Sequence, residues 1–316
     1  MPLIYDYVNQ NAYSGTELMM RGLESRLNPE LSSHFSIGRA IMLFKDDKRT
    51  RIYWTHNLPG QMGIKEVSEK LALNAENRWK FNDKIVFVSE WQKQEYIKHY
   101  NFDEEEQKRL KVLPNAIIPI PEHEKPTGKL RLIYMSVPER GLDILYEVFN
   151  ELSEKYDIEL EVFSSYKIYG IPQVDAVHRN LLDKVKSHPK IIYHGTVSNE
   201  EIHKALERAH IFAYPSTFLE TSCVALIEAM SAGCLCVHSN IAGLPETSAG
   251  FTNMYNFERI PYNHIQVFKA ELEKAIIQYQ NGEISHLKDQ KEYTDKKYSW
   301  DVRINEWNEY LTSLLW

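Results

Sequence analysis

The stretch that decides the fold is residues 216–233, which have the sequence STFLETSCVALIEAMSAG. It follows a short apolar run, Ile211–Pro215, that is typical of a buried strand, and its second half, Cys223–Ala232, has the composition of a helix. In open α/β sheets the ligand binds at the carboxyl ends of the strands, next to the N-termini of the helices that follow. The turn between this strand and this helix is therefore where we expect a functional site.

Two carboxylates lie in this stretch, Glu220 in the turn and Glu228 inside the helix, with seven residues between them. A carboxylate among apolar residues is costly to bury unless it is hydrogen-bonded or paired. Glu228 therefore either faces a ligand, such as the vicinal hydroxyls of a ribose, or pairs with a nearby lysine or arginine. Glu220 lies about two helical turns earlier, at the mouth of the helix, where it would meet a more distal hydroxyl-bearing group.

Outward from this stretch, apolar strand-like runs alternate with helical patterns along the whole chain. The segment Ile117–Lys129 interrupts them with three prolines and a glycine, and we interpret it as a linker. The predicted strands are Pro2–Val8, Arg39–Phe44, Arg51–His56, Lys84–Ser89, Leu110–Pro114, Leu130–Ser136, Ile158–Phe163, Lys190–Tyr193, Ile211–Pro215 and Cys234–Ser239. The predicted helices are Thr16–Leu27, Val67–Lys80, Glu90–Tyr100, Leu142–Tyr156, Asp175–Ser187, Asn199–His210, Cys223–Ala232, Asn263–Gln280, Ser285–Lys297 and Trp300–Leu315. This pattern predicts an α/β protein with two doubly wound Rossmann-like domains and a ligand cleft between them.

The composition excludes several classes of protein. The 316 residues carry a net charge of -7, so nucleic acid is not expected as a partner. The longest apolar runs are too short to span a bilayer, and the N-terminus lacks the pattern of a secretory signal. Three cysteines cannot form a disulfide framework, which favours the cytoplasm. Cys234 and Cys236 are interpreted as buried core rather than metal ligands, because no third and fourth ligand stands at a suitable spacing.

Two further turns between a strand and a helix lie in the N-terminal part. Gly15 lets the backbone approach a ligand closely, and the helix N-terminus behind it favours an anion. The alternative is that Ser14 or Thr16 simply caps the helix. His56 ends a predicted strand, where a titratable side chain would face the mouth of a cleft, although a lone histidine is more often structural than catalytic.

Arg140 lies between the predicted strand Leu130–Ser136 and the helix that follows it. Its planar guanidinium could hold a phosphate group next to the positive end of that helix. The alternative is a surface arginine that pairs with Glu139 or Asp143.

Taken together, these motifs resemble the signature of family-4 retaining glycosyltransferases of the GT-B fold. The resemblance covers nearly the whole chain and is densest over residues 130–250. Its main carriers are the E-x7-E pair Glu220/Glu228, Ala229-Met230, Ala232-Gly233 and Gly243-Leu244-Pro245-Glu246. Further matches follow in chain order: Gly15, His56, Val88-Ser89-Glu90, Pro114-Asn115-Ala116, Pro138-Glu139-Arg140-Gly141-Leu142, His194-Gly195-Thr196-Val197 and Ser299-Trp300.

The resemblance implies that a nucleotide-sugar binds mainly to the C-terminal domain, without a cofactor or a metal. It assigns Glu228 to the ribose, Glu220 to the donor sugar and Arg140 to the diphosphate, and it implies that Glu220, Arg140 and His56 are catalytic. It also places the amides of Thr221, Ser222 and Cys223 around the donor sugar and phosphate. The segment of Gly195, Thr196 and Val197 would lie near the base. In the N-terminal domain, Gly15 would lie beside the diphosphate and His56 along the sugar site.

The chain departs from the family's pattern in two places. Tyr134-Met135-Ser136 stands where the family usually has a Gly-Arg pair, so one phosphate-binding cation is missing or is weakly replaced by Ser136. The N-terminal domain is also short, which reduces the acceptor side. We predict an N-terminal domain over residues 1–120, a nucleotide-sugar-binding domain over 121–298, and a helix over 299–316 that crosses back to the first domain.

The predicted function is retaining transfer of a hexose-type sugar from a nucleotide-diphosphate sugar to a glycan, lipid or protein-linked acceptor. No Asp-x-Asp triplet occurs, in agreement with metal independence. The resemblance implies front-face attack, with no long-lived covalent intermediate. The alternative is a non-catalytic nucleotide-sugar-binding protein or a partner subunit of a transferase. An epimerase or phosphorylase on the same fold and a two-domain sugar receptor are further alternatives, and contact with a membrane surface stays open.

Overall fold

The computed structural model describes residues 13–39, 48–61 and 73–316. The chain forms two compact units, the first comprising residues 15–116 and 298–316, the second residues 117–297 together with 13 and 14. The predicted strand Pro2–Val8 and residues 67–72 of the predicted helix Val67–Lys80 fall outside the described residues. In the described remainder of that predicted helix, residues 78–80 belong to the short helix Arg78–Phe81. The predicted linker Ile117–Lys129 contains no helix and forms only an isolated bridge before the second unit's first strand.

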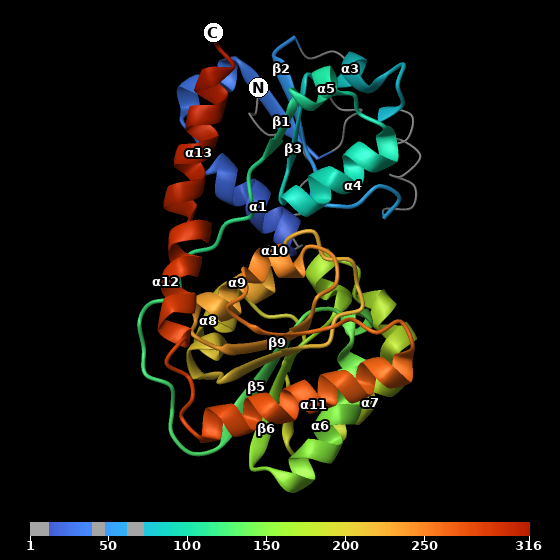
Figure 1. Ribbon diagram of the computed structural model, residues 1–316, viewed down its shortest axis with the longest axis vertical. Coiled ribbons are helices and arrows are strands. Elements are labelled where there is room, and N and C mark those ends of the chain that lie inside the picture. The colour runs from blue at the N-terminus through green and yellow to red at the C-terminus, as the bar shows by residue number, and fades with distance from the viewer. Residues whose placement is uncertain (1–12, 40–47, 62–72) are drawn as a thin grey trace. The chain divides into compact units, whose positions relative to one another are not determined.

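The first unit contains a four-stranded parallel sheet whose strands follow one another in chain order. These are β1 (Phe35–Gly38), β2 (Thr50–Trp54), β3 (Lys84–Phe87) and β4 (Leu110–Val112). Its described helices are α1 (Gly15–Glu24), η1 (Pro29–Ser33), α3 (Arg78–Phe81), α4 (Glu90–Tyr100), α5 (Glu104–Gln107) and α13 (Trp300–Ser313). Figure 1 shows these elements with their labels.

Strand β1 differs from the predicted strand Arg39–Phe44. All four residues of Phe35–Gly38 are buried, and Arg39 comes after the strand. Its Nη1 donates to Oε1 of Glu17 on α1 at 2.8 Å. The side chain of Arg39 therefore forms an ion pair with the helix, and the residue is not part of the strand. The sequence FSIG has only two large apolar residues, too few to show strand periodicity. Residues 40–44 lie outside the described part of the chain.

Helix α13 packs within the first unit. Ser299 caps it, accepting a hydrogen bond from the amide of Val302. A Cβ atom built on Gly22 of α1 would lie 2.0 Å from the ring of Trp300, so only glycine leaves room for that indole. Further along the helix, Trp307 is fully buried, with its ring centroid 5.1 Å from that of Trp54 on β2.

The second unit contains a six-stranded parallel sheet in the order β10-β9-β8-β5-β6-β7. Its strands are β5 (Leu130–Met135), β6 (Ile158–Phe163), β7 (Ile191–Tyr193), β8 (Ile211–Tyr214), β9 (Leu235–Ser239) and β10 (Asn253–Tyr255). Its helices are η3 (Pro138–Arg140), α6 (Leu142–Lys155), η4 (Tyr166–Tyr169), η5 (Pro172–His178), α7 (Arg179–Ser187), α8 (Asn199–Arg208), α9 (Val224–Ser231), α10 (Leu244–Ser248), α11 (Pro261–Gln280) and α12 (Leu287–Tyr298). The predicted α/β class with two parallel sheets is confirmed.

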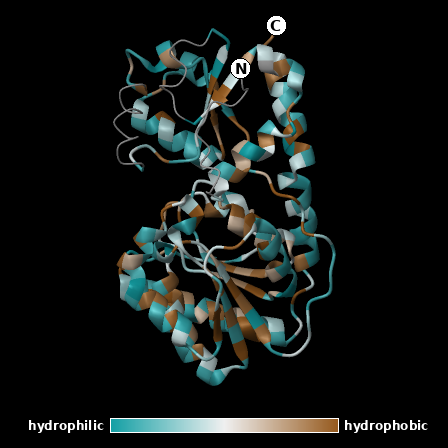
Figure 2. Cartoon of the chain, turned by 180° about the vertical axis from the view of Figure 1, so that it is seen from behind, coloured by the Kyte–Doolittle hydropathy of each residue, from teal (hydrophilic) through white to brown (hydrophobic). Residues whose placement is uncertain are grey.

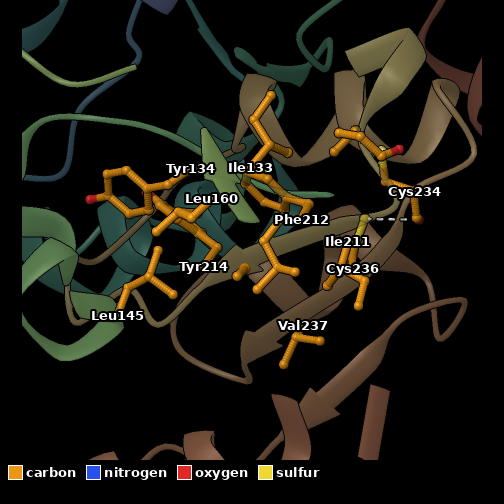
Figure 3. Packing of buried hydrophobic residues seen from close by; sticks show 14 of the residues in the cluster. Ile133, Tyr134, Leu145, Leu160, Ile211, Phe212, Tyr214, Cys234, Cys236 and Val237 are labelled. Atoms are coloured by element: carbon orange, nitrogen blue, oxygen red, sulfur yellow. Dashed lines mark hydrogen bonds between the residues drawn. The ribbon is translucent and has the colours of Figure 1, made fainter. Parts of the chain in front are cut away.

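Helices cover both faces of the larger sheet, with α6 and α11 side by side on one face and α8 and α9 together on the other (Figure 1). Figure 2 shows hydrophobic residues concentrated in the strands and hydrophilic residues on the outer parts of the helices. The core close-up in Figure 3 includes Cys234 and Cys236, which are free, buried thiols, as the sequence predicts. Among the described residues, no helix combines the length and apolar composition that crossing a bilayer requires.

The segment after β6 differs from the predicted helix Asp175–Ser187, because η5 precedes α7 and the α-helix begins only at Arg179. Asp175 is used by the loop rather than by the helix. One of its carboxylate oxygens accepts from the amide of Tyr166 at 2.7 Å and the other from the hydroxyl of Ser165 at 2.5 Å. Several short elements, among them α10 and β10, are absent from the sequence prediction.

Candidate functional site

The order of the larger sheet places two loops next to each other. From β5 the chain proceeds outward through β6 and β7, whereas β8 lies on the other side of β5 and leads to β9 and β10. The boundary between β5 and β8 is the topological switch point, where open α/β sheets bind ligands beyond the carboxyl ends of the strands. The loop after β5 carries Arg140 and the loop after β8 carries Glu220, so the two predicted residues meet at this point.

Arg140 contacts Glu220 directly. Its Nη1 donates to Oε1 of Glu220 at 2.6 Å, and its Nη2 donates to the hydroxyl of Tyr169 at 3.2 Å. The guanidinium carbon also lies 4.1 Å from the ring centroid of Phe218, an arrangement favourable for a cation and an aromatic face. Arg140 is therefore not the surface arginine paired with Glu139 or Asp143 that the sequence left open.

The surroundings of Arg140 keep its guanidinium charged and give hydrogen-bond partners, among the described residues, to only some of its N–H groups. Burial alone would lower the pKa of the Arg140 guanidinium, but the charge of Glu220 outweighs it and the pKa lies well above its ordinary value. Its Nε is buried without a hydrogen-bond partner in the described part of the chain. A buried N–H group in that state is a donor available to an anion.

Two glycines hold the loop after β8 in position. A Cβ atom on Gly141, whose φ is +99°, would lie 2.4 Å from the carbonyl oxygen of Pro215. A Cβ atom on Gly243 would lie 2.5 Å from the carbonyl oxygen of Thr221, and the amide of Gly243 donates to the carbonyl of Glu220 at 2.8 Å. Because no side chain fits at either position, the backbone on both sides packs directly against the loop that carries Glu220.

Glu228 lies inside α9 and is buried, as the sequence predicts, and its partner is a histidine rather than a lysine or arginine. Oε1 of Glu228 lies 3.3 Å from Nε2 of His203 on the adjacent helix α8. The hydrogen bond with Glu228 raises the pKa of His203. His203 is half-buried, so part of the pair is accessible to solvent.

The His203–Glu228 pair predicts a pH dependence of stability. A histidine whose folded pKa is raised stabilises the fold fully below its unfolded pKa of 6.5, and this contribution is lost as the pH rises through the folded pKa. His203→Gln is expected to lower the free energy of unfolding by about 0.5–1 kcal/mol at pH 6 and to have little effect at pH 9. Calorimetric melting at both pH values measures this, with Lys204→Gln on the exposed face of α8 as the control. An equal loss at both pH values would contradict a charged pair.

The N-terminus of α9 carries the other predicted donor-binding residues of this loop. Thr221, Ser222 and Cys223 are all buried, and Cys223 occupies the N-cap position without a side-chain capping hydrogen bond. The positive end of the helix dipole thus lies beside Glu220 without a side-chain cap. Ser136, the first residue after β5, is half-buried in the loop that leads to Arg140.

The predicted base-binding segment of Gly195, Thr196 and Val197 follows β7 and is tied to the loop after β6. The hydroxyl of Tyr193 donates to the carbonyl of Ser164 at 2.6 Å, and that of Thr196 to the carbonyl of Ser165 at 3.4 Å. Gly195 has a φ of +69°, a left-handed conformation that favours glycine. The chain therefore turns sharply between β7 and α8.

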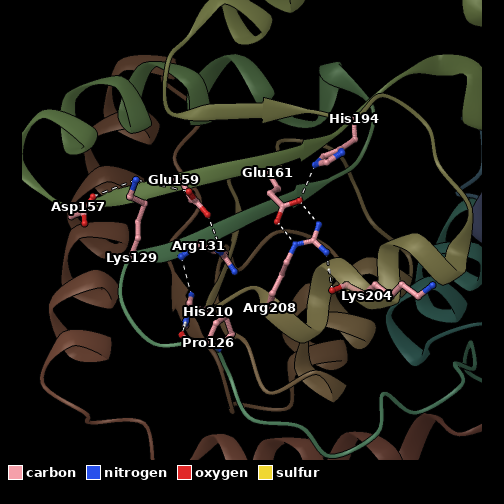
Figure 4. A network of polar contacts seen from close by, with 10 residues as sticks. All are labelled: Pro126, Lys129, Arg131, Asp157, Glu159, Glu161, His194, Lys204, Arg208 and His210. Atoms are coloured by element: carbon pink, nitrogen blue, oxygen red, sulfur yellow. Dashed lines mark hydrogen bonds and ion pairs between the residues drawn. The ribbon is translucent and has the colours of Figure 1, made fainter.

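A network of polar contacts supports this edge of the sheet, as Figure 4 shows. Glu161 on β6 accepts from Nε of Arg208 at 2.6 Å and also contacts Nε2 of His194 at 2.8 Å. The His194 ring stacks on Phe163, with centroids 4.3 Å apart and planes within 3°. The residue before Gly195 is thus fixed from two sides.

His56 and Gly15 belong to the first unit. Gly15 is the first residue of α1. His56 follows β2 and is buried, with its ring centroid 4.6 Å from that of Trp54. Burial, together with the charge of Arg39, lowers the pKa of His56 to about 3, so its imidazole is neutral at physiological pH.

Sequence reasoning missed several residues that contact the predicted ones. Tyr214 and Tyr169 contact the Arg140–Glu220 pair, Phe218 lies against Arg140, and His203 contacts Glu228. Tyr214 carries the one usable signal, a hydroxyl at the end of an otherwise apolar strand. Within the described residues, no three His, Cys, Asp or Glu side chains gather in a way that would hold a metal ion.

Comparison with known proteins adds independent findings. Residues 120–295 match the protein family described as Glycosyl transferases group 1. A human protein, named as a subunit of phosphatidylinositol N-acetylglucosaminyltransferase, is 25% identical over 186 residues, which are 55% of this chain and only 34% of that protein.

Two solved structures show the fold. A glycosyltransferase from Rickettsia africae is 14% identical, with a TM-score of 0.68 over 97% of this chain and 84% of that one. HepE from Anabaena, solved in complex with UDP and glucose, is 14% identical, with a TM-score of 0.70 over 98% and 83% of the two chains. This likeness shows the GT-B fold.

Proposed function

We propose that this chain, which belongs to the glycosyl transferases group 1 family, a retaining GT-B family, transfers a sugar from a nucleotide-sugar donor to a hydroxyl-bearing acceptor. The observation that carries the proposal is the contact of Arg140 with Glu220 at the β5/β8 switch point. A cation with an unsatisfied buried N–H and a carboxylate lie together there, beside the N-terminus of α9. The cation is suited to bind a diphosphate, and the carboxylate is suited to accept hydrogen bonds from the hydroxyls of a sugar.

The proposed roles follow from these positions. Arg140 and the amides of Thr221, Ser222 and Cys223 hold the diphosphate and the adjoining sugar, and Glu220 accepts from the donor sugar. Glu228 accepts from the ribose hydroxyls in competition with His203. The remaining roles are proposed from the resemblance: Gly195, Thr196 and Val197 near the base, Ser136 and Gly15 beside the diphosphate, and the neutral His56 along the sugar site.

In the proposed mechanism, the bond between the sugar's anomeric carbon and the diphosphate breaks while the acceptor hydroxyl attacks from the same face. The charge that develops on the leaving diphosphate is stabilised by donors fixed before the reaction, Arg140 and the amides of α9. The leaving phosphate oxygen takes the acceptor's proton. The new bond therefore keeps the donor's anomeric configuration.

A panel of nucleotide-sugars tests the proposal most directly. A ligand that binds only the folded state raises the melting temperature. The name of the human relative favours N-acetylglucosamine as the sugar, and the Anabaena structure, which holds UDP and glucose, favours UDP-sugars. The panel therefore begins with the UDP-activated forms of both sugars, and GDP-, ADP- and CMP-sugars complete it. We expect one donor to raise the melting temperature and to release its nucleoside diphosphate slowly in water. A panel without any shift would contradict the proposal.

A second candidate is a non-catalytic donor-binding subunit. It is favoured by Ser136, which stands where the family usually has an arginine, and by the word "subunit" in the name of the human relative. Such a protein would bind the donor, with a shift in melting temperature, and would release no nucleoside diphosphate with or without acceptors. A glycan, a lipid or a protein acceptor fits the proposal equally.

Replacing the two carboxylates should separate binding from turnover. Glu228→Ala is expected to weaken binding of the free nucleoside diphosphate about tenfold or more, because it removes charge-assisted hydrogen bonds to the ribose. Glu220→Ala is expected to lower kcat while nucleotide affinity stays within about twofold. Calorimetry and initial rates measure the two effects. Unchanged nucleotide affinity in folded Glu228→Ala would show that the ribose assignment is wrong.

Removing divalent cations should leave the reaction intact. The charge at the diphosphate is assigned to Arg140 and to backbone amides, so EDTA is expected to change the initial rate by less than about twofold. The control is the same assay with added Mg²⁺ or Mn²⁺. An activity that EDTA abolishes and that either metal restores would contradict this assignment.

A further inference from the structure

We infer that Tyr214 is a positioning residue whose hydroxyl holds Glu220 in place when the diphosphate of a donor draws Arg140 away from that carboxylate. The inference rests on the proposed function. Tyr214 is the last residue of β8, and its side chain is buried in the core, in the neighbourhood of Tyr134 and Phe212 (Figure 3). Sequence patterns and family resemblance leave it without a role.

Two donors meet on one oxygen of Glu220. The hydroxyl of Tyr214 donates to Oε1 at 2.5 Å, and Nη1 of Arg140 donates to the same oxygen at 2.6 Å. No hydrogen bond from the described residues reaches Oε2. The two donors thus fix the orientation of the carboxylate and leave its second oxygen for the hydroxyl of a bound sugar.

Tyr214 is suited to remain a donor. Burial, together with the charge of Glu220, raises the pKa of its phenol well above the ordinary value, so the proton stays on the oxygen. Its ring stacks against Phe212 with centroids 5.3 Å apart and planes at 26°, which fixes the direction of the hydroxyl. The sheet therefore holds this donor rigidly, whereas Arg140 lies on the short η3 turn.

A diphosphate that takes two parallel hydrogen bonds from Arg140 competes with the present partners of its Nη groups, because Nε, unpartnered among the described residues, supplies only one of the two. A diphosphate carries more charge than a carboxylate and can accept two parallel hydrogen bonds from a guanidinium. Glu220 is only 6% exposed, so it would be left buried and underpaired when Arg140 turns to the phosphate. The Tyr214 hydroxyl supplies the bond that remains. Tyr214 should thus matter for recognition of the sugar and not for recognition of the nucleotide.

The test compares Tyr214→Phe with a matched variant, Tyr134→Phe. Tyr134 is also buried in this core, 6.0 Å from Tyr214 between ring centroids, but its hydroxyl donates to the carbonyl of Val137 at 2.8 Å. Calorimetry gives the affinities for the nucleotide-sugar selected by the panel and for its free nucleoside diphosphate. We expect Tyr214→Phe to lower the ratio of the two affinities about tenfold and Tyr134→Phe to leave it unchanged. An unchanged ratio in Tyr214→Phe would overturn the inference.

A second measurement needs no ligand. Tyr214→Phe and Glu220→Gln should shift the denaturant midpoint together by less than the sum of their separate shifts, whereas Tyr134→Phe and Glu220→Gln should add. Additive shifts for the first pair would overturn the inference even in an active enzyme. A wild-type chain that binds no nucleotide-sugar and no nucleoside diphosphate would overturn the proposed function and, with it, the positioning role. In that case a non-additive shift for the pair Tyr214→Phe and Glu220→Gln would show only that Tyr214 contacts Glu220.

Discussion

Arg140→Ala is expected to lower kcat/KM for sugar transfer by about 100- to 1,000-fold, the usual effect of removing one fixed donor to a developing charge. The loss should be large because the two loops that meet at the β5/β8 switch point offer no second cation. The loops after β5 and β8, residues 136–141 and 215–223, contain no other lysine or arginine. The variant also leaves Glu220 buried with Tyr214 as its remaining side-chain donor, so some loss of thermal stability should accompany the loss of activity.

Two variants make the result interpretable. Arg140→Lys keeps the charge but not the planar fork, so it should retain more activity than alanine and still fall well below wild type. Arg179→Ala removes an exposed arginine at the start of α7 and should change neither activity nor stability. Initial rates with the panel's donor measure all three. A folded Arg140→Ala variant with activity within about threefold of wild type would show that another group stabilises the diphosphate.

The alternation of strands and helices was predictable because each element has a strong local signal. Helix α4 begins and ends where the sequence predicts, since Ser89 accepts a hydrogen bond from the amide of Gln92 as its N-cap. Strand β1 lacks such a signal, with only Phe35 and Ile37 as large apolar residues. The short elements β10 and α10 are held by their neighbours rather than by periodicity, which three and five residues cannot display.

For the candidate site, the sequence indicates candidate residues but not the contacts between them. Arg140 and Glu220 each follow a predicted strand, but they are 80 residues apart, and only the strand order β8-β5 brings them together. The partner of Glu228 depends on which face of α8 meets α9, which no pattern in either helix specifies. The role of His203 therefore became visible only in the folded chain, and the sequence signal of Tyr214 did not indicate which residue its hydroxyl contacts.

Deletion of residues 300–316 is expected to unfold the first unit at temperatures that the wild-type chain tolerates. Helix α13 buries Trp300, Trp307 and Leu311, of which the last two are fully inaccessible to solvent. Truncating a single buried tryptophan costs about 3–5 kcal/mol, whereas whole proteins are stable by only about 5–15 kcal/mol. Losing the entire helix also leaves the surfaces of Gly22 and Trp54 exposed, since these residues pack against it.

A shorter deletion provides the control for this prediction. Residues 314–316 follow α13, and Leu315 and Trp316 are exposed, so removing these three residues deletes apolar side chains without opening the core. Scanning calorimetry, binding of a hydrophobic dye and initial rates should show loss of the first unit's transition, increased dye binding and loss of turnover for the long deletion alone. Because donor binding is proposed to rest mainly on the second unit, a weakened nucleotide response should survive. A long deletion that melts and turns over like wild type would mean that α13 contributes nothing to the fold it covers.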